Sequence, residues 1–240
     1  MLAKRAFRDL LETTLHEELR RRRHPMWAVL FDPDRPNLAL ARDIATEVFQ
    51  ITKHFVTYIE HLYFYCPDAR HKRLLLSNLY EEETGKLSRT KNHIELMRDF
   101  VRALGVSDAV IDAHAPLPTT RALVEYRMRA VKNFAKYHVG AAAVMIASEG
   151  QSLEDEAAEK RDSLFGRCYG LTAKDTLFFT VHRNEDVGHV QQGLSLVSDL
   201  CHDERSQQEA LEAIRTTTRL FHEMYEGMNQ RYLVSPAVAV

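Results

Sequence analysis

The chain has 240 residues, with 32 Lys and Arg against 34 Asp and Glu, so its formal net charge is −2 with neutral histidines. This length can bury a substantial core, as one large domain or two small ones. The balanced charge argues against nucleic-acid binding. The sequence contains no apolar run of 18 residues, so no membrane span is predicted. It also contains no charged segment followed by an apolar one that would predict a secretion leader.

Three cysteines, Cys66, Cys168 and Cys201, are odd in number and widely spaced. This argues against a disulfide framework and against a zinc–thiolate site. The basic run at residues 20–23 falls where a helix is expected to end, so it complements the helix dipole on a solvated face. We therefore expect a cytoplasmic protein that binds neither nucleic acid nor membrane.

The first half of the chain predicts four helices. Residues 2–23 have apolar side chains at helical spacing and are followed by His24-Pro25, which stops a helix. After a loop with Pro33 and Pro36, one long helix is expected from about residue 44 to Cys66-Pro67. A third helix covers residues 69–83 and ends near Gly85. A polar connector, 86–91, leads to a fourth helix that ends at Gly105.

The second half predicts further helices. Thr119 and Thr120 are N-cap candidates for one helix that continues to Ser148, and another helix covers about residues 152–168. Thr172 is the expected N-cap of a helix that extends to about Leu200, and a last long helix follows. Residues 235–240 are expected to be disordered. The sequence thus predicts one all-α domain over residues 1–234, a bundle of seven or eight helices.

The spacing His182-x3-Asp186-x2-His189 is the strongest functional signal. Seven helical steps of 100° bring His182 and His189 to within about 20° of each other, and Asp186 shares their stripe. Phe178 lies on the same stripe, so it should face the interior. Buried imidazoles and a carboxylate are costly unless they bind something, and a metal ion is the usual partner. The absence of thiolate favours non-haem iron or manganese. The competing interpretation is a solvated helix face with incidental histidines.

Upstream residues could complete such a site. Glu149 ends the most apolar run of the chain. Glu82 and His93 are aligned in helical phase, but one continuous helix would separate them by roughly 16 Å. They can converge only if the chain turns at Gly85. Taken alone, the cluster 81–83 is better interpreted as a solvated helix end.

The order and spacing of these motifs resemble the heme-oxygenase-like diiron oxidases. The resemblance covers about residues 70–200. It is carried by Asn78-Leu-Tyr-Glu-Glu-Glu-Thr-Gly85, Asn92-His93, Ser148-Glu149-Gly, Tyr169-Gly170, and Asp175 to His182 followed by Asp186 and His189. That family shares the TenA and PqqC fold. It includes N-oxygenases, an alkene-forming fatty-acid decarboxylase and a chlamydial para-aminobenzoate synthase.

The resemblance implies a diiron site that uses dioxygen as co-substrate. Two Fe(II) ions, the second of them labile, would be held by Glu82, His93, Glu149, His182, Asp186 and His189. Glu149, His182 and Asp186 would be the catalytic ligands, with Glu149 as the bridge between the metals. Glu81 or Glu83 could replace Glu82, because the connector is slightly long. Lys160 lies near the place of a lysine implicated as a nitrogen donor in the para-aminobenzoate branch.

The implied function is oxidation or cleavage of a small amine- or carboxylate-bearing substrate, of the amino-acid or fatty-acid class, by an iron-dependent oxidoreductase. One alternative is a metal-free TenA/PqqC-like enzyme of cofactor metabolism, although neither Cys66 nor Cys168 lies in an activating context. The other is a non-enzymatic interaction module. A homodimer and the choice between iron and manganese stay open.

Overall fold

The computed structural model describes residues 1–153 and 158–234, and within these ranges it contains helices and no strand. The all-α prediction is therefore confirmed. Side chains are described up to Arg231. The predicted disordered tail, residues 235–240, lies outside the described residues.

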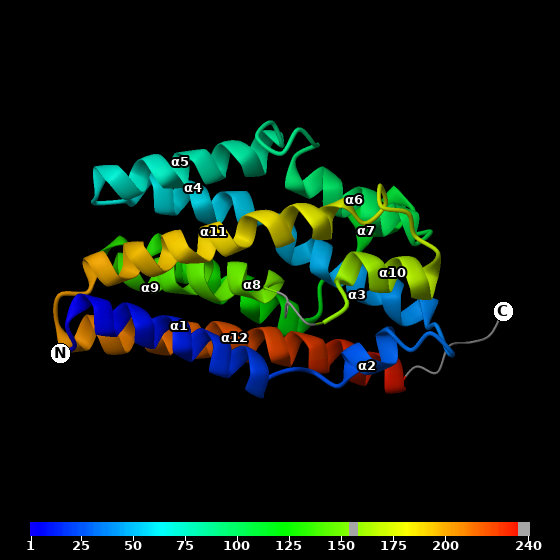
Figure 1. Ribbon diagram of the computed structural model, residues 1–240. Coiled ribbons are helices and arrows are strands. Elements are labelled where there is room, and N and C mark those ends of the chain that lie inside the picture. The colour runs from blue at the N-terminus through cyan, green and yellow to red at the C-terminus, as the bar shows by residue number, and fades with distance from the viewer. Residues whose placement is uncertain (154–157, 235–240) are drawn as a thin grey trace.

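The first half of the bundle contains α1 (Lys4–Arg21), α2 (Met26–Leu30), α3 (Leu38–Thr52), α4 (Phe55–Tyr65), α5 (Ala69–Thr84), α6 (His93–Ala103) and α7 (Asp108–Ala113). The second half contains α8 (Pro118–Lys132), η1 (Phe134–Lys136), α9 (Tyr137–Ala141), η2 (Ala142–Ser148), η3 (Glu149–Ser152), α10 (Arg161–Tyr169), α11 (Leu177–Leu200) and α12 (Glu204–Val234). Figure 1 shows α11 running through the middle, between the pair α4 and α5 on one side and α1 with α12 on the other.

The turn between α5 and α6 follows the sequence prediction. Gly85 ends α5 in the left-handed conformation, with φ 61°, and its N–H donates to the Glu81 carbonyl. A Cβ at this position would collide with the backbone of Lys91, so only glycine fits. Asn92 then caps α6, since its side chain accepts from the Glu95 N–H at 2.8 Å. This turn lets α6 pack back against α5.

Two predicted long helices are broken. The apolar repeat of residues 44–62 continues through a bend at Lys53 and His54, which separates α3 from α4. There Thr52 Oγ1 donates to the Val48 carbonyl at 3.0 Å, and the His54 N–H turns to the Ile51 carbonyl, three residues back. The segment predicted as one helix to Ser148 also breaks, at Asn133. These breaks and the short helices α2 and α7 give more segments than the seven or eight predicted.

Three predicted helix starts are wrong. Leu117 is the N-cap of α8 with Pro118 as its first residue, because proline presets the helical φ and needs no donor, so Thr119 and Thr120 lie inside the helix. The helix predicted from residue 152 begins at Arg161. Residues 154–157 of that prediction lie outside the described residues. Thr172 closes a turn with Asp175, and α11 starts later, at Leu177.

The core has two parts that meet along α11. One contains Val190, Leu194 and Val197 of α11 with residues of α1, α4, η2 and α12. The other contains Phe178 and Val181 of α11 with residues of α3, α6, α10 and α12. The stretch between residues 181 and 190 therefore crosses the junction of the two cores. The predicted metal triplet lies in this stretch.

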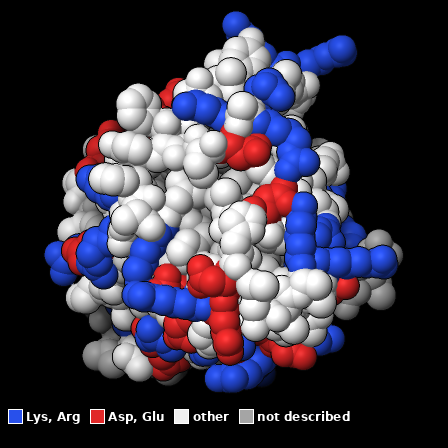
Figure 2. All heavy atoms as spheres, turned by 90° about the vertical axis from the view of Figure 1, so that its left-hand side faces the viewer, with Lys and Arg blue, Asp and Glu red and all other residues white. Residues whose placement is uncertain are grey.

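The surface offers no large region of one charge sign on the end of the bundle that Figure 2 displays. Lys and Arg alternate there with Asp and Glu around a largely uncharged centre. Within the described residues, no helix combines the length and the apolar character that a bilayer crossing requires.

Candidate metal centre

Helix α11 presents its three predicted ligands toward the interior. Asp186 is buried, and the side chain of His189 is 11% exposed. The ring of His182 is oriented by its own helix, because Nδ1 lies 2.7 Å from the Phe178 carbonyl oxygen. An Nδ1–H that donates to this carbonyl leaves Nε2 with a free lone pair, as a metal-binding histidine requires.

The first group of candidate ligands joins three helices. Glu82 from α5, His93 from α6 and His182 from α11 each offer a ligand atom, and these atoms lie within 4.8 Å of one another. His93 Nδ1 is 3.0 Å from Glu82 Oε2, and the ring centroids of His93 and His182 are 4.6 Å apart. We call these three residues the first group.

The second group contains Glu149, Asp186 and His189, whose ligand atoms also lie within 4.8 Å of one another. His189 Nδ1 is 3.4 Å from Glu149 Oε1 and 3.5 Å from Asp186 Oδ1. Asn78 of α5 orients the Glu149 carboxylate, because its Nδ2 donates to Oε1 at 3.2 Å. The six residues predicted as ligands thus form two adjacent groups of three.

The position of Glu149 depends on irregular backbone. The preceding segment, η2, is a π-helix, which is rare and is frequent at functional sites. Helix α11 approaches it closely at Gly193, where a Cβ would lie 2.8 Å from the Met145 carbonyl carbon. This close approach brings Glu149 opposite His189.

Six nitrogen and oxygen atoms of the candidate ligands are buried and lack hydrogen-bond partners among the described residues. Both ring nitrogens of His93, both carboxylate oxygens of Asp186, Glu82 Oε1 and His189 Nδ1 are in this state. His93 Nδ1 is close to Glu82, but the two groups are not oriented for a hydrogen bond. Unpaired buried polar atoms are costly. A donor set of imidazole nitrogen and carboxylate oxygen fits iron, which would satisfy these atoms.

Imidazoles and carboxylates lie close together in this site, and burial and these neighbours shift their pKa values. Burial opposes a charge on His189, but the carboxylates of Glu149 and Asp186 outweigh it and raise its pKa to about 11. In the same way Glu82, together with Glu185 and Asp186, outweighs burial at His93 and raises that pKa to about 9. Burial lowers the pKa of His182 to about 4. Burial and the neighbouring Glu149 raise the pKa of Asp186 to about 6.

The three glutamates of the 81–83 cluster have different environments. Glu82 is buried and belongs to the first group, and Glu83 is exposed. Glu81 is also buried, and its carboxylate accepts from the N–H of Leu87 at 2.6 Å and of Ser88 at 3.2 Å. Burial acts to raise the pKa of Glu81, but a bond from the Ser88 hydroxyl and these two backbone bonds lower it. The interpretation of this cluster as a solvated helix end is therefore wrong for Glu81 and Glu82.

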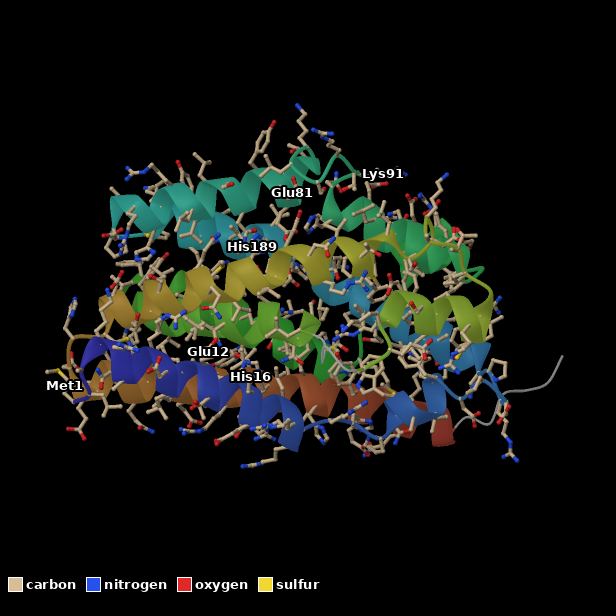
Figure 3. The ribbon with its side chains drawn as sticks, in the orientation of Figure 1. Met1, Glu12, His16, Glu81, Lys91 and His189 are labelled. Carbon is tan, nitrogen blue, oxygen red and sulfur yellow. The ribbon has the colours of Figure 1, made fainter. Side chains whose placement is uncertain are left out.

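Glu81 also lies near the site. Figure 3 shows it at the end of α5 that enters the connector, with His189 on α11 below. Its Oε1 is 3.8 Å from His93 Nε2, and Glu185 Oε2 is 3.6 Å from the same nitrogen. Glu81, His93 and Glu185 form a further group that could hold a cation. The alternative of Glu81 as ligand thus stays open, whereas the exposed Glu83 is not in any of these groups.

A cavity of about 120 Å³ opens beside the two groups. Glu82, Glu149, His182 and Asp186 are among the residues that line it. Its other walls are mostly apolar and aromatic, with Trp27, Met97, Phe100, Phe165, Phe178, Phe179 and Phe221 among them. Such a cavity beside the candidate ligands can hold a small molecule and keep bulk water from it.

Comparison with known proteins identifies the family of the chain. Residues 42–222 match the model of a family described as iron-containing redox enzymes. The chain belongs to this family. It is 30% identical, over 73% of its own length and 70% of the other chain, to a 4-aminobenzoate synthase of Chlamydia muridarum. The prediction of an iron-dependent oxidoreductase is confirmed.

Solved structures confirm the predicted heme-oxygenase-like, TenA-like fold. A domain with a heme oxygenase-like fold from Shewanella denitrificans superposes with a TM-score of 0.70 at 14% identity, covering 100% of this chain and 97% of that one. A TenA homolog from Pseudomonas syringae gives 0.73 at 15% identity, covering 94% and 93%. At these identities the likeness concerns the fold alone.

Sequence reasoning missed several residues around this candidate site. Asn78 served only as a family marker, and its bond to Glu149 connects helices far apart in the chain. Glu185 lies beside Asp186 and received no role. Arg127 is a charged residue on the apolar stripe of α8, aligned with Leu123 and Val131, and that helical phase was the available signal. Lys160 is the N-cap of α10 and is not among the described residues that line the cavity.

Proposed function

We propose that the protein is a diiron oxygenase that activates dioxygen to oxidise or cleave a small amine- or carboxylate-bearing molecule. The observation that carries the proposal is the pair of adjacent three-residue groups, with unpaired buried ligand atoms, beside a single cavity. Two metals need about six protein ligands, which the two groups together supply. Bound ferrous iron would supply the electrons that reduce dioxygen.

The chain itself would orient the ligands and exclude water. The Phe178 carbonyl fixes the ring of His182, and Asn78 holds one oxygen of Glu149. Such outer partners keep first ligands in place and tune their basicity. The phenylalanines of the cavity keep the substrate side apolar. Glu149 as the bridging carboxylate remains a prediction, which its position beside Asp186 and His189 supports.

The reaction to test first is formation of 4-aminobenzoate. The named relative at 30% identity is a 4-aminobenzoate synthase, and this product bears both an amine and a carboxylate. The cavity suits a molecule of this size, because an engineered protein cavity of roughly 150 Å³ holds benzene. Mass spectrometry of the iron-loaded protein after exposure to air would detect the product.

The metal-free alternative has weak support from the cysteines. All three are buried. Burial raises the pKa of Cys201 to about 12 and also raises the pKa of Cys168. A nucleophilic cysteine needs a lowered pKa and access to the substrate, and neither Cys66, Cys168 nor Cys201 lines the cavity among the described residues.

Anaerobic reconstitution with Fe(II), followed by an oxygen pulse and optical spectroscopy, tests the proposal. We expect uptake of up to two irons per chain and an absorbance change that requires oxygen. A folded protein that takes up no iron would refute the oxygenase and favour the metal-free alternative.

A further inference from the structure

Among the residues whose side chains are described, Arg127 is the largest that is fully buried, at 2% exposure. It projects from α8, far in sequence from the metal-centre helices, and lines the same cavity as Glu149 and His182. Its neighbours on the buried stripe of α8 are small or apolar, among them Leu123 and Ala130. A guanidinium in such a position is rare and requires a partner.

The protein supplies hydrogen-bond partners for only some of the N–H groups of the Arg127 guanidinium. Nη1 donates to Ser148 Oγ at 3.4 Å, whereas Nε and Nη2 have no hydrogen-bond partner among the described residues. No carboxylate of the described residues forms an ion pair with it. The rings of Tyr58 and Phe221 lie 4.8 and 5.4 Å from the guanidinium carbon. These rings stabilise the charge in part. The Tyr58 hydroxyl also favours the charged guanidinium, but it makes no hydrogen bond to Nε or Nη2.

The unused donors have a defined shape. Nε and Nη2 form one edge of the planar guanidinium, and two parallel N–H groups on one edge match the two oxygens of a carboxylate. Burial lowers the pKa of Arg127, but an arginine remains protonated in proteins. A buried charge without a counterion is strongly unfavourable. An anion brought in with a ligand would supply the missing partner.

We propose that Arg127 anchors the carboxylate of a small monocarboxylate, about one ring in size, in the cavity beside the metal centre. The Ser148 contact fixes the place of this anchor, because Ser148 directly precedes the candidate ligand Glu149. The aromatic walls would hold the ring of the ligand. The inference rests on the proposed oxygenase site, since it gives that site its substrate class.

Calorimetric titration of the metal-free protein with benzoate and with benzamide, its neutral isostere, tests the anchor. Trp27, the single tryptophan, lines the cavity, so its fluorescence reports whether the ligand enters this cavity. We expect wild type to prefer benzoate by at least about tenfold, as loss of one charge-assisted pair implies. Equal affinity for the two compounds would overturn the proposal.

Variants locate the preference. Arg127→Met should remove the preference, because its affinity for benzoate should fall at least about tenfold while its affinity for benzamide stays unchanged. Arg127→Lys should recover only part of it, because lysine lacks the two-donor edge. Arg129→Met is the matched control, since Arg129 is exposed and lies on the same helix. An unchanged benzoate preference in Arg127→Met would refute the anchor.

Stability separates a binding role from a structural one. If Arg127 serves the ligand, Arg127→Met should unfold at the wild-type temperature or above it, because an unpaired buried charge is removed. If Arg127→Met unfolds at a lower temperature than wild type and Arg127→Lys keeps the full preference for benzoate, Arg127 has a structural role. This result would overturn the proposal. Iron uptake by Arg127→Met should match wild type. If the wild-type protein takes up no iron, the proposed oxygenase function is refuted instead.

Discussion

The two ligand groups differ in how the chain builds them and in their charge. The first group joins Glu82, His93 and His182 from three helices, whereas the second takes Asp186 and His189 from one helical turn of α11 and adds Glu149. The first has one carboxylate and two imidazoles, and the second has two carboxylates and one imidazole. A single motif, His-x3-Asp-x2-His, therefore serves two groups.

The division of the motif follows from helix geometry. His182 and His189 share a stripe, but seven residues of α-helix rise roughly 10 Å. Ligands of one ion lie only about 4 Å apart, so one ion does not reach both imidazoles. Alignment on one stripe identifies residues that face the same direction, not residues that meet at one point. The second carboxylate should make the second group the stronger site for a divalent cation.

The largest effect is expected for Glu149→Ala. The variant loses a carboxylate of the stronger group and the predicted bridge, so iron content should fall from two equivalents to one or none. The oxygen-dependent absorbance change should disappear. Metal analysis after anaerobic loading measures this loss. Iron content equal to wild type would remove Glu149 from the ligand set.

A smaller effect is expected for His93→Ala, which affects the first group alone. One equivalent of iron should be lost, while the remaining equivalent binds with wild-type affinity. His138→Ala is the control, because His138 pairs with Glu209 at 3.0 Å and does not line the cavity among the described residues. If His93→Ala loses both irons, the two groups do not bind independently.

Iron loading should stabilise the fold, because a ligand that binds only the native state adds stability. At a free iron concentration 100 times the Kd, the gain is about 2.7 kcal/mol, or roughly 5–10 °C in Tm for a chain of this size. Differential scanning calorimetry with and without a chelator measures it. An unchanged Tm with bound iron would mean that the unfolded chain binds iron equally well.

The smallest effects separate Glu81 from Glu83. Glu81→Ala leaves the N–H groups of Leu87 and Ser88 without their acceptor, which should cost about 1–3 kcal/mol of unfolding free energy. Glu83→Ala removes an exposed carboxylate and should change stability by less than about 0.5 kcal/mol. Urea denaturation of the metal-free proteins compares them.

Glu82→Ala is the reference for these two variants. It should lose one iron and keep its fold. If Glu81→Ala loses iron while Glu82→Ala keeps it, the first group uses Glu81 as its carboxylate.

The sequence by itself determined the all-helical class, because helical spacing of apolar residues and stop signals such as Gly85 are local properties of the chain. Residue type and spacing also indicated His182, Asp186 and His189, whereas the full set of six residues was implied only by the family resemblance. The sequence did not predict the bend between α3 and α4, because an apolar repeat continues across a bend. It did not predict the π-helix before Glu149 either.

Only the tertiary structure decided which residues meet. The division of His182 and His189 between two groups depends on where α5, α6 and η2 contact α11. The burial of Glu81 depends on the path of the connector, and the unpaired edge of Arg127 depends on which side chains surround it. These are contacts between residues distant in the chain, and local spacing carries no information about distances across the bundle.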